Sequence, residues 1–196
     1  MSGTFLGEPP ESDGARRLYD EDLAGVGYVM NLSRLWAYAP GVREGLVRVL
    51  GELAEAYGLG LRERGILIAA CASTLGDAYC SLAWGGRLAG LAGEDVAAAV
   101  LAGTDEGLTD AERAMARWAR AVARDPNGTT AADVTELREA GFADDRIFGI
   151  TAFLAFRLAF STVNDALGAS PDAAYRTAAP PAVRAAVTYG RPIDDT

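Results

Sequence analysis

The stretch LRERGILIAACASTLGDAYCSLAW, residues 61–84, predicts two consecutive helices that meet at a sharp turn. Its first part begins charged and then becomes apolar on all sides, a pattern typical of a helix buried in the middle of a protein. Gly76 interrupts this helix, and aspartate is a preferred N-cap residue, so Asp77 is expected to begin a new helix. We therefore expect these two helices, over residues 61–75 and 77–91, to form the centre of the fold.

The segments on either side also repeat apolar residues at helical spacing, and β-branched runs are few. The helix expected over 42–58 is amphipathic, with Arg43 on its outer face. The sequence predicts an all-α, single-domain bundle of about eight helices over residues 22–170. Residues 1–21 are expected to form a flexible arm, and residues 171–196 a C-terminal extension with one short helix. Further helices are expected over 22–40, 93–103, 108–126, 129–142 and 143–167.

Composition narrows the possible partners. Half of the 196 residues are hydrophobic and the net charge is −9, which argues against nucleic acid or an anionic membrane as a partner. Small organic acids remain possible ligands where a pocket is locally positive. The most apolar stretch, residues 147–163, carries Arg157 in its middle and is short for a membrane span. The first residues lack the apolar core of a secretory signal.

The cysteine and histidine counts limit the chemistry. Cys71 and Cys80 are the two cysteines of the chain, too few for a disulfide framework, so a cytoplasmic location is expected. The chain has no histidine, which excludes histidine-based proton relays and most zinc or iron sites. We expect neither a metal nor another cofactor.

The start of the helix at 77–91 is the candidate site. Asp77, Cys80 and Trp84 follow one another at i, i+3 and i+7, along one helical face, with Tyr79 beside them. A carboxylate buried near an indole has a raised pKa, which suits a general acid or base. The alternative is purely structural: Asp77 is an ordinary cap, Cys80 a small buried side chain and Trp84 a core residue.

Arg157 is the other candidate, because it is a single cation within an apolar helix. A buried guanidinium needs a carboxylate partner, which could be Asp77 or a bound ligand. Alternatively, its long side chain reaches the surface or a subunit contact.

These segments together resemble the alkylhydroperoxidase-like carboxymuconolactone decarboxylase family. The resemblance covers roughly residues 25–170 and is carried, in order, by GYVMNLSRLWAYAP, by the stretch at 61–84, by LTDAERAMARWARAV and by VTELREAGFADDRIFGITAFLAFRLAFSTVNDALG. It implies a helical fold and a homo-oligomer, a trimer or a hexamer. The small residues of WGG, 84–86, would allow close approach at a subunit interface or beside a substrate pocket.

The resemblance also implies that the family's active site is degenerate here. Its peroxidase branch uses a glutamate, two cysteines separated by two residues, and a histidine four residues further on. Gly65 stands in place of the glutamate, Asp77 in place of the first cysteine and Trp84 in place of the histidine, while Cys80 is retained. A disulfide needs two sulfur atoms about 2 Å apart, so these positions cannot form one. Cys71 is expected to be a buried core cysteine.

Three functions remain open. The first is acid–base chemistry of the decarboxylase, isomerase or lyase type on a small organic acid or lactone. In it Asp77 moves the proton, Arg157 holds the anionic group, and Tyr79 and Trp84 shape the pocket. The second is a single-cysteine thiol peroxidase, in which Cys80 is oxidised and an external thiol restores it. The third is a catalytically silent oligomer that acts as a binding protein.

Overall fold

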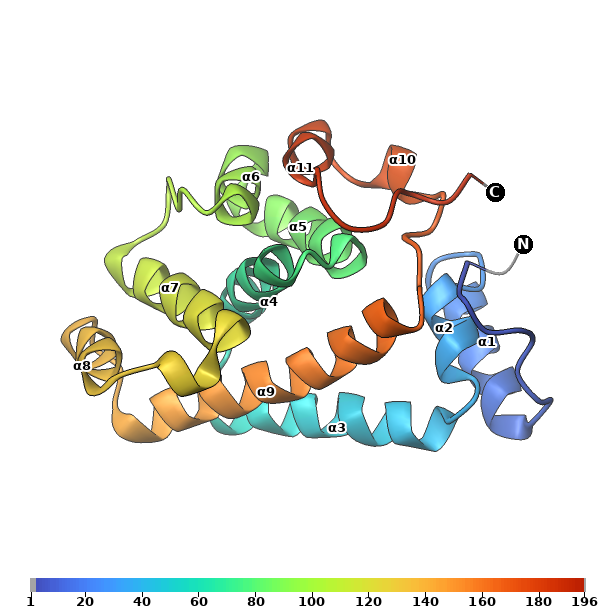
Figure 1. Ribbon diagram of the computed structural model, residues 1–196, viewed down its shortest axis with the longest axis horizontal. Helices are drawn as coiled ribbons and strands as arrows, with labels where there is room; N and C mark the ends of the chain where they lie inside the picture. Colours follow the sequence, from blue (N-terminus) through green and yellow to red (C-terminus); the bar gives the residue numbers. More distant parts are fainter. Residues whose placement is uncertain (1–2, 196) are drawn as a thin grey trace.

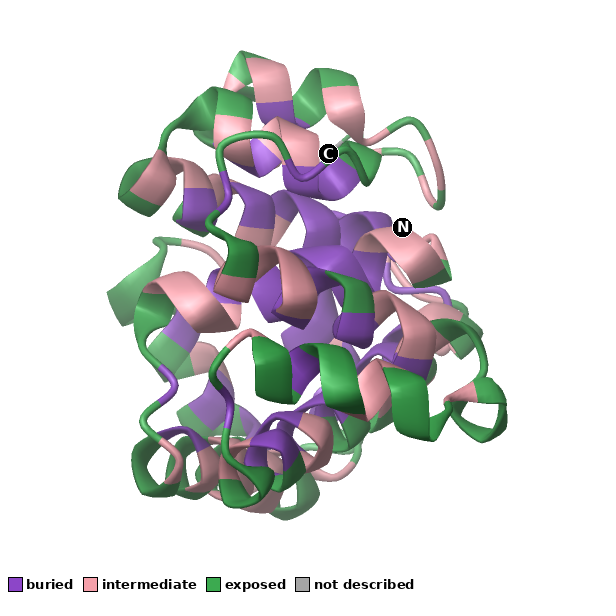
Figure 2. Ribbon diagram, turned by 90° about the vertical axis from the view of Figure 1, so that its left-hand side faces the viewer, coloured by how far each residue is buried: buried purple, intermediate pink, exposed green. Residues whose placement is uncertain are grey.

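Helices α4 (Leu61–Leu75) and α5 (Ala78–Ala92) pack against each other in the middle of the molecule, as Figure 1 shows for the computed structural model, which describes residues 3–195. Helix α4 also contacts α6 (Glu94–Ala102), α7 (Asp110–Arg124) and α9 (Asp144–Ala166). Residues 65–72 of α4 are therefore all buried, and buried residues gather along these central helices in Figure 2. This environment explains why α4 is apolar all round.

The break between the two central helices lies where the sequence predicts it. Gly76 adopts a left-handed conformation with φ 75°, which a side chain would strain, and it ends α4. Asp77 then caps α5, because its side chain accepts a hydrogen bond from the backbone N–H of Cys80. The chain thus reverses direction within two residues and begins α5 at the candidate site.

Within residues 3–195 the regular structure is entirely helical. This described part of the chain contains eleven α-helices, of which eight span nine residues or more, so the predicted all-α fold of about eight helices is confirmed. The remaining elements are α1 (Asp13–Gly25), α2 (Asn31–Trp36), α3 (Pro40–Ala56), a 3-10 turn (Pro126–Gly128), α8 (Ala131–Glu139), α10 (Tyr175–Ala178) and α11 (Pro181–Ala186).

Two hydrophobic clusters stabilise this arrangement. The larger is built mainly from α4, α6, α7 and α9 and contains Cys71. The smaller one joins α2 to α5 and α9 and contains Tyr79, Cys80 and Phe160. The candidate site therefore lies in the smaller cluster, where the N-terminal helices meet the central pair.

The expected flexible arm over residues 1–21 was wrong for most of the part that the structure describes. Helix α1 begins at Asp13, capped by Ser12, and it buries Leu18. Before it, the N–H of Phe5 donates to the carbonyl of Leu167 at 2.9 Å. Burial and these hydrogen bonds hold the segment in place; Met1 and Ser2 lie outside the described residues.

The single helix expected over residues 22–40 was also wrong. Helix α1 ends at Gly25 and α2 begins at Asn31. Gly27 adopts φ 85° between them, and the buried Asp22 accepts a hydrogen bond from the N–H of Met30 at 2.9 Å. Met30, which follows this turn, lies at the candidate site.

The C-terminal extension forms two short helices rather than the one expected, and it folds back on α5 and α6 (Figure 1). A Cβ atom at Gly85 would lie 2.9 Å from side-chain atoms of both Leu101 and Val183. Part of the close approach expected at residues 84–86 thus serves packing within the chain, of α5 against α6 and α11. Asp194 N–H also donates to the carbonyl of Pro171 at 2.8 Å.

Helix α9 is long and apolar enough to cross a membrane when judged by length and composition alone. It is longer than the stretch of residues 147–163 that the sequence singles out. Half of its most apolar part is buried inside the molecule, where α9 packs on α3, α4 and α7. Core helices of globular proteins share these properties.

Candidate functional site

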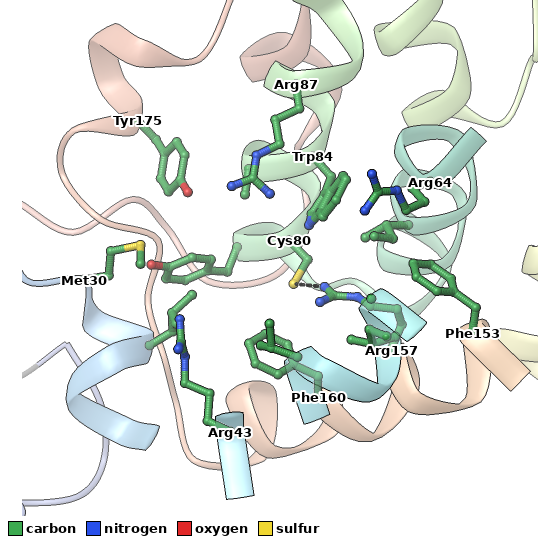
Figure 3. Close-up of a pocket in the computed structure, with 17 residues that line it drawn as sticks. Met30, Arg43, Arg64, Cys80, Trp84, Arg87, Phe153, Arg157, Phe160 and Tyr175 are labelled. Carbon is green, nitrogen blue, oxygen red and sulfur yellow. Dashed lines mark hydrogen bonds between the residues drawn. The ribbon is translucent and has the colours of Figure 1, made fainter. Parts of the chain in front are cut away.

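A cavity of about 400 Å³ opens beside the start of α5. Figure 3 shows side chains from several helices turned towards it, with Cys80 at its inner wall. Most of the wall is apolar and aromatic, and arginines supply its charge. The lining residues are Met30, Leu32, Arg43, Val47, Leu50, Gly51, Arg64, Ile68, Tyr79, Cys80, Ala83, Trp84, Arg87, Phe153, Arg157, Phe160 and Tyr175.

The thiol of Cys80 lies at this wall and is paired with Arg157. The Nη2 of Arg157 donates a hydrogen bond to Sγ at 3.2 Å, and the hydroxyl of Ser161 lies 3.8 Å from the same sulfur. Burial raises the pKa of the Cys80 thiol and the negative charge of Asp77 raises it further, whereas Arg157 and Ser161 act in the opposite direction. The thiol is therefore protonated at neutral pH.

Arg157 is buried and packed between aromatic rings. Its guanidinium carbon lies 4.8 Å from the centre of the Phe160 ring and 5.9 Å from that of Trp84. Phe160 in turn stacks on Trp36, with ring centres 5.2 Å apart. In the described part of the chain no carboxylate pairs with Arg157, so of the two partners considered, Asp77 and a bound ligand, Asp77 is excluded. Its burial also excludes the alternative of a surface position.

Asp77 does not line the cavity, which corrects the expectation that it would face the ligand. Its Oδ1 accepts the backbone N–H of Cys80 at 2.8 Å, and its Oδ2 is buried without a hydrogen-bond partner. A capping carboxylate lies over the first N–H groups of its own helix, and this hydrogen bond holds Asp77 outside the cavity wall. Asp77 thus acts on the site through Cys80.

Tyr79 and Trp84 both lie in the cavity wall, as expected. The hydroxyl of Tyr79 donates to Oδ2 of the buried Asp172, while the N–H of Asn31 donates to Oδ1 at 2.7 Å. This network holds the Tyr79 ring as a rigid wall, and burial raises the pKa of its hydroxyl well above the usual range.

Three arginines of the wall were not predicted from the sequence: Arg43, Arg64 and Arg87. Arg43 was expected on the outer face of its helix, yet it lines the cavity, which is a correction. The missed residues come from α3, α4 and α5, where each belongs to an ordinary charged face. No local pattern identifies them, because only the packing of the three helices brings them together.

Cys71 is not part of the cavity wall, although the charges of Arg157 and Asp77 act on its thiol. It lies in α4 within the larger hydrophobic cluster, does not line the cavity, and both cysteines are free thiols. Burial raises the pKa of the Cys71 thiol to about 12. Gly65, which stands where the resemblance implies a glutamate, packs against α5. A Cβ atom at Gly65 would lie 3.3 Å from the side chain of Leu88. Residues 3–195 contain no group of three or more side chains suited to hold a metal ion.

Two solved structures share this architecture. An uncharacterized peroxidase-related protein from Ralstonia eutropha JMP134, described as an alkylhydroperoxidase AhpD core, matches with a TM-score of 0.71 and 24% identity, over 88% of this chain and 94% of that one. An uncharacterized peroxidase-related protein from Silicibacter sp. TM1040 matches with a TM-score of 0.72 and 22% identity, over 90% and 96%. No protein-family model matches the chain, and no curated protein does either.

The chain therefore has the alkylhydroperoxidase-like helical fold, as the resemblance of residues 25–170 predicts. Within this fold, the wall of the cavity holds the buried thiol of Cys80 beside the buried guanidinium of Arg157.

Proposed function

We propose that this protein is a single-cysteine thiol peroxidase in which Cys80 reduces a hydroperoxide bound in the cavity. The observation that carries the proposal is the pair formed by Cys80 Sγ and Arg157 Nη2, 3.2 Å apart at the cavity wall. Two proteins of the same fold are described as peroxidase-related, which agrees with this chemistry.

The proposed reaction converts the thiol to a sulfenic acid. The sulfur attacks the terminal oxygen of the hydroperoxide, a sulfur–oxygen bond forms and the oxygen–oxygen bond breaks. The thiol proton ends on the leaving oxygen, so that a thiol and a hydroperoxide yield a sulfenic acid and an alcohol. Arg157 supports the step because its guanidinium stabilises negative charge on sulfur and on the leaving oxygen.

The sulfenic acid then has to be reduced by external thiols. Two equivalents of a small thiol restore Cys80 and yield one disulfide and one water. Cys71 is unsuited to this second role because it belongs to the larger hydrophobic cluster and does not line the cavity.

The other functions considered receive less support. The acid–base hypothesis assigns the proton transfer to Asp77, and Asp77 is not among the described residues that line the cavity. A catalytically silent protein would be expected to fill the degenerate site with side chains, whereas about 400 Å³ is open beside Cys80.

Oxidation of the reduced protein tests the proposal. On treatment with a hydroperoxide, the intact mass should rise by one oxygen atom, and dimedone should label Cys80. Cys71→Ser should behave like the wild type, because that thiol does not line the cavity, while Cys80→Ser should lose both signals. If Cys80→Ser consumes hydroperoxide as fast as the wild type, or if the wild type gains no oxygen, the proposal is wrong.

A further inference from the structure

The charge of the cavity is opposite to that of the molecule. The chain carries a net charge of −9, yet four of the described residues that line the cavity are arginines and none is an aspartate or glutamate. An acidic protein that gathers arginines at one concave apolar site creates a local positive potential there. Such a site attracts a small anion that the rest of the surface repels.

Two of these arginines have no ionic partner within residues 3–195. Neither Arg64 nor Arg87 lies within ion-pair distance of a carboxylate, whereas Arg43 lies 3.8 Å from Glu21 and Arg157 is paired with the sulfur of Cys80. The Nε of Arg64 is buried and makes no hydrogen bond. Arg64 is half-buried and Arg87 is exposed, so both guanidinium groups are free to pair with an anion that enters the cavity.

The two unpaired arginines flank one aromatic side chain. Figure 3 shows Trp84 between Arg64 and Arg87, with Cys80 and Arg157 further inside. The Arg87 guanidinium carbon lies 4.7 Å from the centre of the Trp84 ring. The site thus offers cations at one part of the wall and the reactive thiol at another.

The remaining wall suits an apolar body. Leu50, Ile68, Phe153 and Phe160 line it, and about 400 Å³ is enough for a small organic molecule. A singly charged carboxylate costs less to bring into such surroundings than a phosphate group, which carries close to two charges at neutral pH. Arginine binds a carboxylate through two parallel hydrogen bonds.

We infer that the substrate is a hydroperoxide with an apolar body and a carboxylate, bound with its carboxylate at Arg64 and Arg87 and its peroxide group at Cys80 and Arg157. This inference rests on the proposed function for the reaction, but the anion site can be tested without it. The reaction is the one described above: the substrate leaves as the corresponding hydroxy acid, and the oxygen lost stays on Cys80.

Binding is measured first, on Cys80→Ser, which cannot react. Titration calorimetry with para-isopropylbenzoate should reveal binding at least about ten-fold tighter than that of para-isopropylbenzamide, which lacks the charge. Arg64→Gln and Arg87→Gln should each weaken benzoate binding about ten-fold, while the matched change Arg117→Gln, at an exposed position on α7, should not. Inorganic phosphate should compete more weakly than the benzoate. Equal binding of benzoate and amide, wild-type affinity in both cavity variants, or tighter binding of phosphate would overturn the inference.

Reaction rates are measured second, on the wild type. Cumene hydroperoxide bearing a para-carboxylate should oxidise Cys80 at least about ten-fold faster than cumene hydroperoxide itself at low concentration, and Arg87→Gln should remove this advantage. Because Arg87 is exposed, this variant should retain the fold. Equal rates for the two hydroperoxides would overturn the inference while leaving the peroxidase proposal intact. Benzoate binding without any oxidation of Cys80 would instead overturn the peroxidase proposal and retain the anion site.

Discussion

At the scale of single residues, the reactivity of Cys80 depends on opposing influences. Its position at a helix start and the guanidinium of Arg157 favour the thiolate, whereas burial and Asp77 favour the thiol, and burial is the largest effect. The sequence indicates the helix start and the acidic neighbour. The extent of burial and the contact with Arg157 arise only when α9 packs beside α5.

This balance predicts a pH dependence for the oxidation of Cys80. Because the pKa of the thiol is raised, the reactive thiolate is a minor species at neutral pH. As long as the pH is below that pKa, each increase of one pH unit makes the thiolate about ten-fold more abundant. The rate constant for Cys80 oxidation should therefore keep rising through pH 9, as measured by stopped-flow fluorescence or quenched mass analysis.

Asp77→Asn is the matched variant for this prediction. Asparagine caps a helix as well as aspartate does but carries no charge, so it should shift the pH–rate curve to lower pH and leave the fold intact. A plateau near neutral pH in the wild type, or an unshifted curve in the variant, would contradict the influence of burial and Asp77.

At the scale of elements, the helical periodicity predicts most of the helices because each buries one face in a way that the local pattern records. The prediction failed at residues 22–40, where the buried Asp22 and the left-handed Gly27 stabilise a turn that periodicity does not reveal. It failed again at the N-terminus, where α1 is held by packing against α2 and α3. Tertiary contacts decided both cases.

The glycine pair after Trp84 provides a prediction at this scale. Replacing a helical glycine by alanine is worth about 0.5–1 kcal/mol of stability where space allows. At Gly86 the new Cβ would make only ordinary contact, 3.7 Å from Pro180, so Gly86→Ala should be stabilising. At Gly85 it would overlap with Leu101 and Val183, and overpacking of this kind typically costs about 1–3 kcal/mol.

We therefore expect Gly85→Ala to be less stable than Gly86→Ala, with a free energy of unfolding at least about 1 kcal/mol lower. Urea denaturation of the two variants and the wild type measures this difference. Equal stability of the two variants would mean that α11 does not pack on α5 as described.

At the scale of the whole molecule, the segments near the two ends of the chain lie side by side (Figure 1), and the Arg191 guanidinium carbon lies 4.4 Å from the centre of the Phe5 ring. The N–H of Ser170 donates to the carbonyl of Gly3 at 2.8 Å, and Arg191 donates to the backbone carbonyl of Asp165 at 3.0 Å. Burial raises the pKa of the Asp165 carboxyl from 3.8 to about 7, the charge of Asp77 adds to this, and Arg191 opposes it. The folded protein thus holds a proton on Asp165 that the unfolded chain releases.

This proton links stability to pH. A carboxyl group whose pKa is higher in the folded state stabilises the fold at low pH, and its contribution is lost as pH rises from about 3.8 to about 7. Asp165→Asn cannot ionise, so its melting temperature relative to that of the wild type should increase across this interval and level off above it. Differential scanning calorimetry at several pH values measures this, and a difference independent of pH would contradict the raised pKa.

The sequence predicted those parts of the candidate site that depend on the spacing of residues within one helix. Tyr79, Cys80 and Trp84 lie within one turn and a half of a helix, so their spacing alone places them together, and all three line the cavity. Asp77 belongs to the same stretch but serves its own helix as a cap. The roles of Arg43, Arg64 and Arg87 were not predictable, because nothing in a single helix indicates which charged residue will face a cavity.

By itself, the sequence determined the all-helical fold, the break at Gly76 and the loss of the two-cysteine site, since helical periodicity, capping and residue identity are local properties. The tertiary structure alone decided that Arg157 pairs with Cys80, that Asp77 is not part of the cavity wall and that four arginines line the cavity. The physical reason is that pairing, burial and cavity charge depend on side chains from different helices, which come together only when the helices pack.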